Sequence, residues 1–245
     1  MRKYLRFPRG LFVLLTLLPA SAAAQDGFRF EPPRVTFHLK AGAAVPNAGG
    51  DLFDMVTDEL TLSRRDFAAS TFGADVALAV NERFDVLLSV STTSAQRFSE
   101  SRHWVKENDE PVEQQTKFRR TPATIGLKYH LRDRGRMIGN HAWVPNRVTP
   151  FVGATGGLMW YRFAQEGEFV DELAGEFFTE EYVSSGKALT AQLLAGVEYW
   201  TSPLLGLQLE GRYQFANAEL EGDFSAFNEI DLRGFQLMAG VSIRL

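Results

Sequence analysis

Histidine is the residue type in this chain best suited to acid–base chemistry, and the 245 residues contain four: His38, His103, His130 and His141. None of them begins a His-x-Ser sequence that would pair base and nucleophile locally. The chain has no cysteine, which excludes a thiol nucleophile and a thiolate metal site. Neither a phosphate-binding glycine loop nor a nucleotide or metal motif occurs. The sequence therefore predicts no catalytic residues, no cofactor and no metal site, and we expect a protein that is not an enzyme.

Carboxylates gather in residues 166–181, a stretch that contains no lysine or arginine. Carboxylate oxygens are ligands for divalent cations, but the spacing here lacks the regularity of a calcium loop. A solvated acidic loop is therefore the favoured interpretation. The carboxylates are those of Glu166, Glu168, Asp171, Glu172, Glu176, Glu180 and Glu181.

Alternation of apolar and polar residues predicts that strands position the remaining polar residues. In residues 235–245 the odd positions, such as Phe235 and Val241, are apolar, and the even ones, such as Gln236 and Arg244, are mostly polar or small. The pattern indicates an all-β, antiparallel up-and-down transmembrane barrel of about eight strands, with ten possible if a long loop hides a hairpin. The expected strands cover residues 35–44, 72–80, 84–93, 123–131, 149–163, 189–199, 205–215 and 235–245.

The polar faces of these strands carry charges, and an eight-stranded barrel leaves an interior just wide enough for side chains to fill. Charges there must pair with one another or with water, and we expect Lys40 near Asp75 and Asp85 near Lys128. His38 and His130 also face inward. A permeation path is the alternative interpretation. The expected interior charges are Lys40, Asp75, Asp85, Lys128, Glu198, Glu210, Arg212 and Arg244.

The connections between these strands alternate in length. Residues 81–83 and 201–204 are tight turns and 132–147 is a longer one, whereas 45–66, 94–120, 164–187 and 216–231 are long loops. Short periplasmic turns, long extracellular loops and an even strand number are typical of outer-membrane barrels. Both termini would then lie in the periplasm.

Aromatic residues fall near the ends of the expected strands, as in the two girdles of a membrane barrel. The outer level would contain Trp160, Tyr161, Tyr213, Phe215 and Phe235. The periplasmic level would contain Phe84, Tyr199 and Trp200.

The N-terminus reads as a cleavable secretory signal in residues 1–24, with basic residues, a short apolar run and small residues before Gln25. The apolar run is shorter than the ~20 residues that a membrane-spanning helix needs. Cleavage would remove four of the 26 lysines and arginines and none of the 30 acidic residues, which leaves a barrel domain, residues 25–245, with a net charge of −8. Nucleic acid is therefore not an expected partner.

Three segments resemble the small outer-membrane barrels of the OmpA transmembrane-domain, OmpX and opacity-protein kind. They are the glycine-rich residues 150–157, residues 194–200 before a tight turn, and the C-terminal residues 240–245. The resemblance implies an assembly signal at Gly240, Val241, Ile243 and Leu245, although the family pattern ends in Phe or Trp. It also implies a location in the bacterial outer membrane, with lipid, lipopolysaccharide and the barrel-assembly machinery as partners.

Members of that family include adhesins, structural anchors, small pores and lipid-modifying enzymes, so the fold leaves function open. The favoured hypothesis is a non-enzymatic barrel with a packed polar interior, whose long loops have a structural role or contact an extracellular ligand. A narrow channel for small solutes, a lipid-modifying enzyme and a soluble periplasmic barrel with inward apolar faces are the alternatives.

Overall fold

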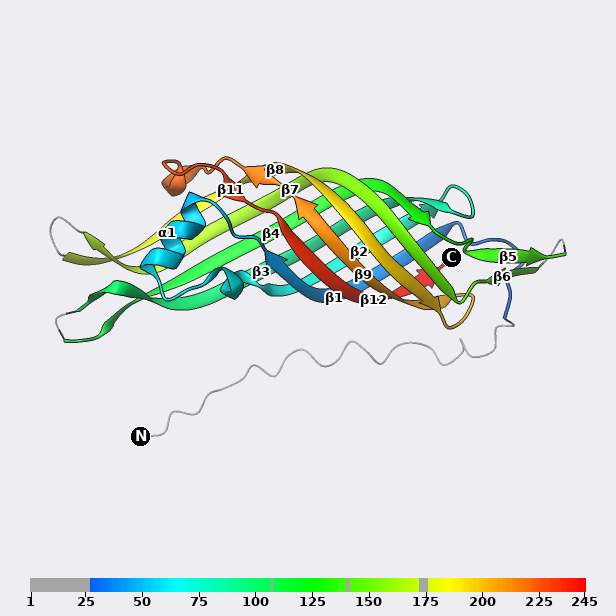
Figure 1. The fold of residues 1–245 in the computed structure, drawn as a ribbon, viewed down its shortest axis with the longest axis horizontal. Coiled ribbons are helices and arrows are strands. Elements are labelled where there is room, and N and C mark those ends of the chain that lie inside the picture. Colours follow the sequence, from blue (N-terminus) through cyan, green and yellow to red (C-terminus); the bar gives the residue numbers. More distant parts are fainter. Residues whose placement is uncertain (1–26, 107, 140–141, 172–175) are drawn as a thin grey trace, which may run out of the picture.

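The computed structural model describes residues 27–106, 108–139, 142–171 and 176–245. The predicted signal peptide, His141 and Glu172 lie outside the described residues. Eight long antiparallel strands close into one barrel (Figure 1). The barrel strands are β1 (Val35–Pro46), β2 (Ala69–Ala79), β3 (Phe84–Val105), β4 (Pro111–His130), β7 (Val148–Asp171), β8 (Glu176–Trp200), β9 (Leu205–Phe215) and β12 (Gly234–Arg244).

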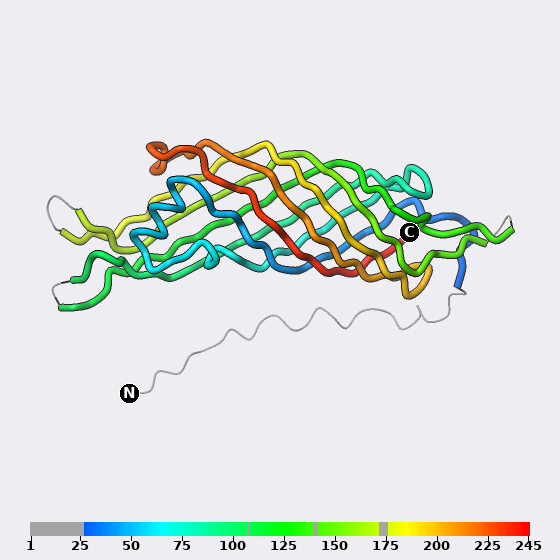
Figure 2. Tube along the Cα trace, in the orientation of Figure 1, coloured from blue at the N-terminus to red at the C-terminus, as the bar shows by residue number. Residues whose placement is uncertain are grey.

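Each barrel strand pairs with the strands that precede and follow it in the ring, and β1 closes the ring against β12 from Thr36↔Arg244 to Pro46↔Gly234. The predicted up-and-down barrel of eight strands is confirmed. Strand β1 starts and strand β12 finishes at the same end of the barrel, here called the inner end (Figure 1). The opposite end, here called the outer end, holds α1 and two projecting hairpins (Figure 2).

Two-residue alternation places the side chains on the two faces of the wall. In β1 the side chains of Phe37 and Leu39 are exposed on the outside, whereas His38 and Lys40 are buried inside. Successive side chains of a strand point to opposite faces, so a shift of one residue would turn the charges toward the outside. The polar pattern of the sequence therefore fixes the inward face.

Two of the predicted long loops are wrong in extent, because they are largely continuations of strands. β3 and β4 remain paired as far as Val105↔Pro111, and β7 and β8 as far as Asp171↔Glu176. Beyond Trp160 the outward positions include the charged Arg119 and Arg162 as well as the apolar Phe98, so the hydrophobic period that marks a lipid-facing strand is interrupted there. The backbone ladder continues because a hairpin outside lipid still satisfies its N–H and C=O groups internally. These extensions project from the outer end (Figure 2).

The other two outer connections carry short elements. Between β1 and β2 lie α1 (Asp51–Glu59) and the 3-10 helix η2 (Arg64–Phe67); between β9 and β12 lie β10 (Asn217–Ala218), the 3-10 helix η3 (Gly222–Phe224) and β11 (Ile230–Asp231). α1 buries Leu52, Phe53 and Val56, which one face of a helix brings together. The connection predicted as a plain loop is therefore an amphipathic helix that packs on the barrel mouth.

The longest inner connection is a hairpin of β5 (Gly135–Ile138) and β6 (Ala142–Pro145), not a simple turn. It carries Trp143, whose side chain is completely buried, and the backbone of Trp143 pairs with Arg29. A Cβ added to Gly135 would lie 2.3 Å from the Trp143 ring, so only glycine lets the indole pack there. The unexpected length of this turn supplies a side chain that fills the inner end.

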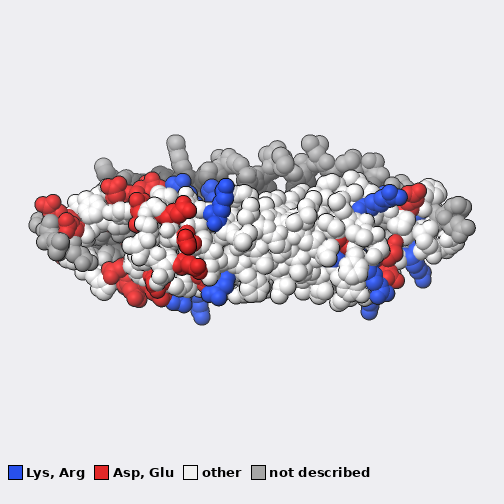
Figure 3. All heavy atoms as spheres, turned by 90° about the horizontal axis from the view of Figure 1, so that it is seen from above, with Lys and Arg blue, Asp and Glu red and all other residues white. Residues whose placement is uncertain are grey.

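The outside of the barrel is apolar around its middle. Figure 3 shows a band without charged residues between two charged ends. Exposed apolar side chains on this band include Leu39, Ile125, Leu193, Leu209 and Val241. A continuous apolar surface of this size is unfavourable in water. Among the described residues, no helix is both long and apolar enough to span a bilayer.

Aromatic side chains border this apolar band at both ends, with two corrections. Trp160, Phe215 and Phe235 are exposed toward the outer end, and Phe84 and Tyr199 toward the inner end. The predicted girdle positions of Tyr161 and Trp200 are wrong, because both side chains are buried inside. Each directly follows an outward-facing aromatic residue, and neighbouring residues of a strand face opposite sides.

Candidate functional site

The eight charged residues expected in the interior are all buried in the barrel, and none is more than 4 % exposed. They come from strands all around the ring, so they meet only because the barrel closes. Their side chains form two groups in the barrel and a closing layer at its inner end.

The central group contains two cations and two anions. Lys40 Nζ contacts Asp75 and lies 2.9 Å from Glu210 Oε1. Arg212 NH2 lies 2.8 Å from Glu210 Oε1 and 3.4 Å from Asp75 Oδ2, and NH1 donates to Ser89. The charges balance, and this satisfies the requirement that a buried ion have a partner.

The second group differs from the expected pairing of Asp85 with Lys128. These residues are opposite each other on β3 and β4, as predicted, but Lys128 Nζ contacts Glu198. Asp85 instead lies 2.8 Å from His130 Nε2 and 3.3 Å from Arg134 NH1. The cause is Arg134, a residue of the inner connection that returns into the barrel and supplies a second cation.

Arg244 closes the inner end between two indole rings. Its guanidinium carbon lies 3.3 Å from the ring centre of Trp200 and 5.3 Å from that of Trp143. Glu198 Oε2 is 3.7 Å from Arg244 NH2. Stacking of a planar guanidinium on aromatic faces is favourable, so the C-terminal strand and the β5–β6 hairpin hold each other in place.

The fold brings together one histidine–serine pair that no local spacing revealed. His38 Nδ1 lies 2.7 Å from Ser242 Oγ, although the residues are 204 positions apart. Both side chains are buried, with exposed fractions of 1 % and 0 %. His103 is exposed on the outer part of β3. A serine nucleophile must reach its substrate, so burial argues for a structural role of this pair.

An aromatic cluster closes the outer end of the interior. The Phe53 ring of α1 packs edge-on against Phe67, Phe118 and Phe163 at centroid distances of 5.1, 5.4 and 5.9 Å. Phe163 also contacts Phe224 of η3 at 5.3 Å. The helix and the loop elements thereby place an apolar layer across the barrel mouth.

The crown is defined here as α1, η2, the segment from β10 to β11, and the projecting parts of the β3–β4 and β7–β8 hairpins. It encloses a cavity of about 400 Å³ above the aromatic cluster. Side chains from α1, both hairpins and the η3 segment line this crown cavity, and most of them are apolar. The mouth of a β-barrel is a common place for a ligand site of this volume.

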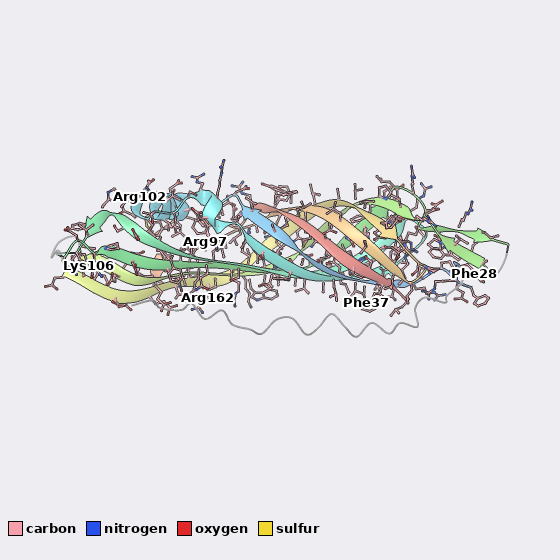
Figure 4. The ribbon with its side chains drawn as sticks, turned by 90° about the horizontal axis from the view of Figure 1, so that it is seen from below. Phe28, Phe37, Arg97, Arg102, Lys106 and Arg162 are labelled. Atoms are coloured by element: carbon pink, nitrogen blue, oxygen red, sulfur yellow. The ribbon has the colours of Figure 1, made fainter. Side chains whose placement is uncertain are left out.

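Ion pairs and caps hold the crown elements together. Lys106 Nζ donates to Glu168 Oε1 at 2.7 Å across the two hairpins, and this contact lowers the pKa of Glu168. The carboxylate of Asp66 accepts hydrogen bonds from the hydroxyl and the backbone N–H of Ser63, which lower the pKa of Asp66. Figure 4 shows Arg97, Arg102, Lys106 and Arg162 toward the outer end and Phe28 at the inner end.

The acidic stretch 166–181 is not a loop, since its described residues lie in β7 and β8. Some of its carboxylates pair with cations from other parts of the chain: Glu166 with Lys117 at 2.7 Å and Glu181 with Arg162 at 3.4 Å. Within the described ranges, no three His, Asp or Glu side chains are grouped so that they could hold a metal ion.

The residues of the expected assembly signal lie on the seam between β12 and β1. Val241 and Leu245 are exposed on the outside. Ile243 is opposite Phe37, and Gly240 is opposite Lys40. A Cβ on Gly240 would lie 2.2 Å from the carbonyl oxygen of Leu39, so the glycine permits the close approach of the two strands.

Sequence reasoning missed Arg134, Trp143, Phe53 and Phe224, which complete both ends of the interior. All four belong to connections rather than barrel strands, and strand periodicity gives no information on where a connection packs. Only the spacing of Leu52, Phe53 and Val56, a helical one, was a local signal.

A closed antiparallel ring with a buried polar interior, an apolar outer band and bordering aromatic residues is a transmembrane β-barrel of the bacterial outer-membrane type. The alternative of a soluble barrel with inward apolar faces is wrong, because the exposed face is the apolar one.

Solved structures similar to this chain are outer-membrane barrels. Neisserial surface protein A is 14 % identical and matches over 90 % of this chain and 98 % of its own, with a TM-score of 0.47. The outer membrane protein OprG of Pseudomonas aeruginosa is 12 % identical and matches over 87 % of this chain and 97 % of its own, with a TM-score of 0.46. Ail, the attachment invasion locus protein of Yersinia pestis, is 10 % identical and matches over 88 % of this chain and 100 % of its own, with a TM-score of 0.44. No protein-family model and no curated protein sequence matches the chain.

Proposed function

We propose that this protein is a non-enzymatic outer-membrane barrel whose crown contacts a ligand or partner outside the cell. One observation carries the proposal: the interior is filled by buried ion pairs and closed by aromatic layers, whereas the crown is an ordered, exposed structure with a cavity. Function in such a molecule is more readily placed in the crown than in the lumen.

The filled interior argues against the alternative of a narrow channel. A permeant solute would have to pass the layer of Phe53, Phe118 and Phe163 at the outer end and the stacked Arg244 at the inner end. Close-packed protein interiors have few voids larger than a water molecule, so a solute could pass only if these side chains moved. A conductance of the wild-type barrel in planar bilayers would favour the channel instead.

Burial of the His38–Ser242 pair supports the absence of enzymatic activity. Both side chains are buried, and Ser242 is not among the residues that line the crown cavity. Unchanged lipid A masses with and without the protein are the expected result, and a changed mass would favour a lipid-modifying enzyme.

Lipid partners fit the surface of the barrel. Lys187 is exposed opposite Trp160, and the exposed Arg119 and Arg162 lie opposite each other just beyond it, where the headgroups of the outer leaflet would lie. Cations at this level attract the phosphates of lipopolysaccharide. The exposed Val241 of β12 and Leu245, the residue after this strand, are suited to contact with the barrel-assembly machinery. Nucleic acid is no expected partner of an acidic chain.

The test shortens both projecting hairpins. Asn-Gly replaces residues 97–116, which joins the paired residues Gln96 and Lys117, and a second Asn-Gly replaces 166–181, which joins Gln165 and Tyr182. Asn-Gly closes a two-residue hairpin without strain. The trimmed protein should assemble, show the heat-dependent gel migration of a folded barrel, and lose the ability to complement a deletion strain.

The matched control puts Asn-Gly in place of Ser202 and Pro203 at an inner turn, which leaves the crown intact. This control should complement the deletion strain. If the trimmed barrel complements as well as the control does, the function does not lie in the crown.

A further inference from the structure

The crown cavity has one wall of consecutive aromatic rings. Phe169 packs against Tyr182 at a centroid distance of 4.7 Å, Tyr182 lies 6.5 Å from Phe224, and Phe224 lies 6.2 Å from Phe227. Trp104 of β3 lines the same cavity and is 36 % exposed. These rings belong to three separate parts of the chain and offer both faces and edges to the cavity.

Gln165, which lines the cavity, and Thr116 beside it have no side-chain hydrogen-bond partner among the described residues. Gln165 lines the cavity with only 4 % of its surface exposed, and its side-chain amide makes no hydrogen bond to the described residues. The buried hydroxyl of Thr116, directly opposite on β4, has none either. Buried polar groups are normally hydrogen-bonded, so an unpartnered amide that lines a cavity points to a ligand with a hydrogen-bonding group.

The charges around the cavity are acidic. Glu59 and Asp223 line it, and no lysine or arginine does. Neither Arg102, which donates to the backbone carbonyls of Leu60 and Leu62, nor Lys106, which is paired with Glu168, is among the lining residues. A cation at the rim would therefore meet two exposed carboxylates and aromatic rings, whereas an anion would meet no cation among the lining residues.

We propose that the crown cavity binds a small hydrophobic ammonium compound, with its apolar body against the rings and its charged nitrogen between Glu59 and Asp223. A volume of about 400 Å³ suits a ligand with roughly ten to fifteen non-hydrogen atoms. The inference specifies the ligand class of the crown and so rests on the proposed function.

The test uses three probes that differ only in the head group: 3-phenylpropylamine, 3-phenylpropanol and 3-phenylpropionate. Full-length barrel in nanodiscs is titrated with each probe, and intrinsic tryptophan fluorescence, to which Trp104 contributes, and saturation-transfer NMR report binding. Empty nanodiscs correct for partition into lipid. The amine should bind at least tenfold more tightly than the carboxylate, with the alcohol between them. Equal affinities would overturn the charge preference, and binding of none of the probes would overturn the site.

Three variants locate the site. Met55→Trp fills the cavity and should abolish amine binding, and Phe227→Ala removes an edge ring and should weaken it. Glu59→Gln should weaken amine binding about threefold to tenfold and leave the alcohol unchanged. The matched control is Asp58→Asn at the neighbouring position of α1: both carboxylates are exposed, but only Glu59 lines the cavity, so this variant should leave the affinity unchanged. Equal losses in the Glu59 and Asp58 variants would mean a general surface field and no site.

Failure of this inference is distinguishable from failure of the proposed function. If the amine does not bind while hairpin shortening still abolishes complementation, the ligand class is wrong and the crown function stands. If the amine binds while the barrel conducts ions or the trimmed barrel complements, the cavity exists and the proposed function is wrong.

Discussion

Removal of Lys40 from the central charge group is the most direct test of the filled interior. Lys40→Met keeps the apolar stem of the side chain but leaves Arg212 as the one cation that pairs with Asp75 and Glu210 among the described residues. At 2.9 Å and an effective dielectric constant of about 20, the Lys40–Glu210 attraction alone is worth about 6 kcal/mol. Desolvation of the lysine offsets part of this attraction. The expected cost is therefore ~3–5 kcal/mol, the usual result of breaking a buried pair from one side.

A second variant separates loss of charge balance from loss of packing. Lys40→Met combined with Asp75→Asn removes one cation and one anion, so that Glu210 and Arg212 remain as a balanced pair. The double variant should be more stable than Lys40→Met alone, with a coupling free energy of ~1–3 kcal/mol between the two sites.

The assay is urea unfolding of the barrel from lipid vesicles, followed by tryptophan fluorescence. Lys117→Met is the control, because Lys117 forms an exposed pair with Glu166 and should lose no more than about 1 kcal/mol. A cost of Lys40→Met as small as that of the control would refute the argument, as would additive effects in the double variant.

Three further predictions concern the wall and the crown. Leu209→Arg on the apolar band should destabilise the assembled barrel by ~2–4 kcal/mol, whereas Phe215→Arg at the outer border should cost ~0–1 kcal/mol. Similar costs of the two variants in vesicle refolding would contradict the placement of Leu209 near the middle of the bilayer and of Phe215 near its surface. Gly240→Ala should cost ~1–3 kcal/mol and slow assembly in vivo, since its Cβ would press on the backbone of β1, and a normal assembly rate would show that this seam is not tight. Hydrogen bonds from Ser63 lower the pKa of Asp66 below its ordinary value. The capped turn η2 should therefore be fully stable at any pH above the ordinary pKa of an aspartate and should loosen as the pH falls through the lowered pKa of Asp66. NMR titration should show this loosening, and Asp66→Asn should make the turn insensitive to acid.

The sequence by itself determined the wall of this barrel. A two-residue period is a local property, so the apolar and polar faces of β1, β9 and β12 could be read without a structure. The same parity places Lys40, Glu210 and Arg244 inside, because in lipid an outward charge is costly. Closure followed as well, since a transmembrane sheet cannot leave an edge unpaired.

The tertiary structure alone decided what fills the two ends and which charges pair. Lys128 pairs with Glu198, and Asp85 pairs with Arg134, which reaches the interior from an inner connection. The spacing of residues within the strands does not show where that connection packs. Similarly, Trp143, Phe53 and Phe224 reach the interior from connections whose own sequences lack a two-residue period. Their positions depend on contacts between residues far apart in the chain, which form only once the ring has closed. The crown cavity has the same origin, because its lining comes from elements that meet only above the closed barrel.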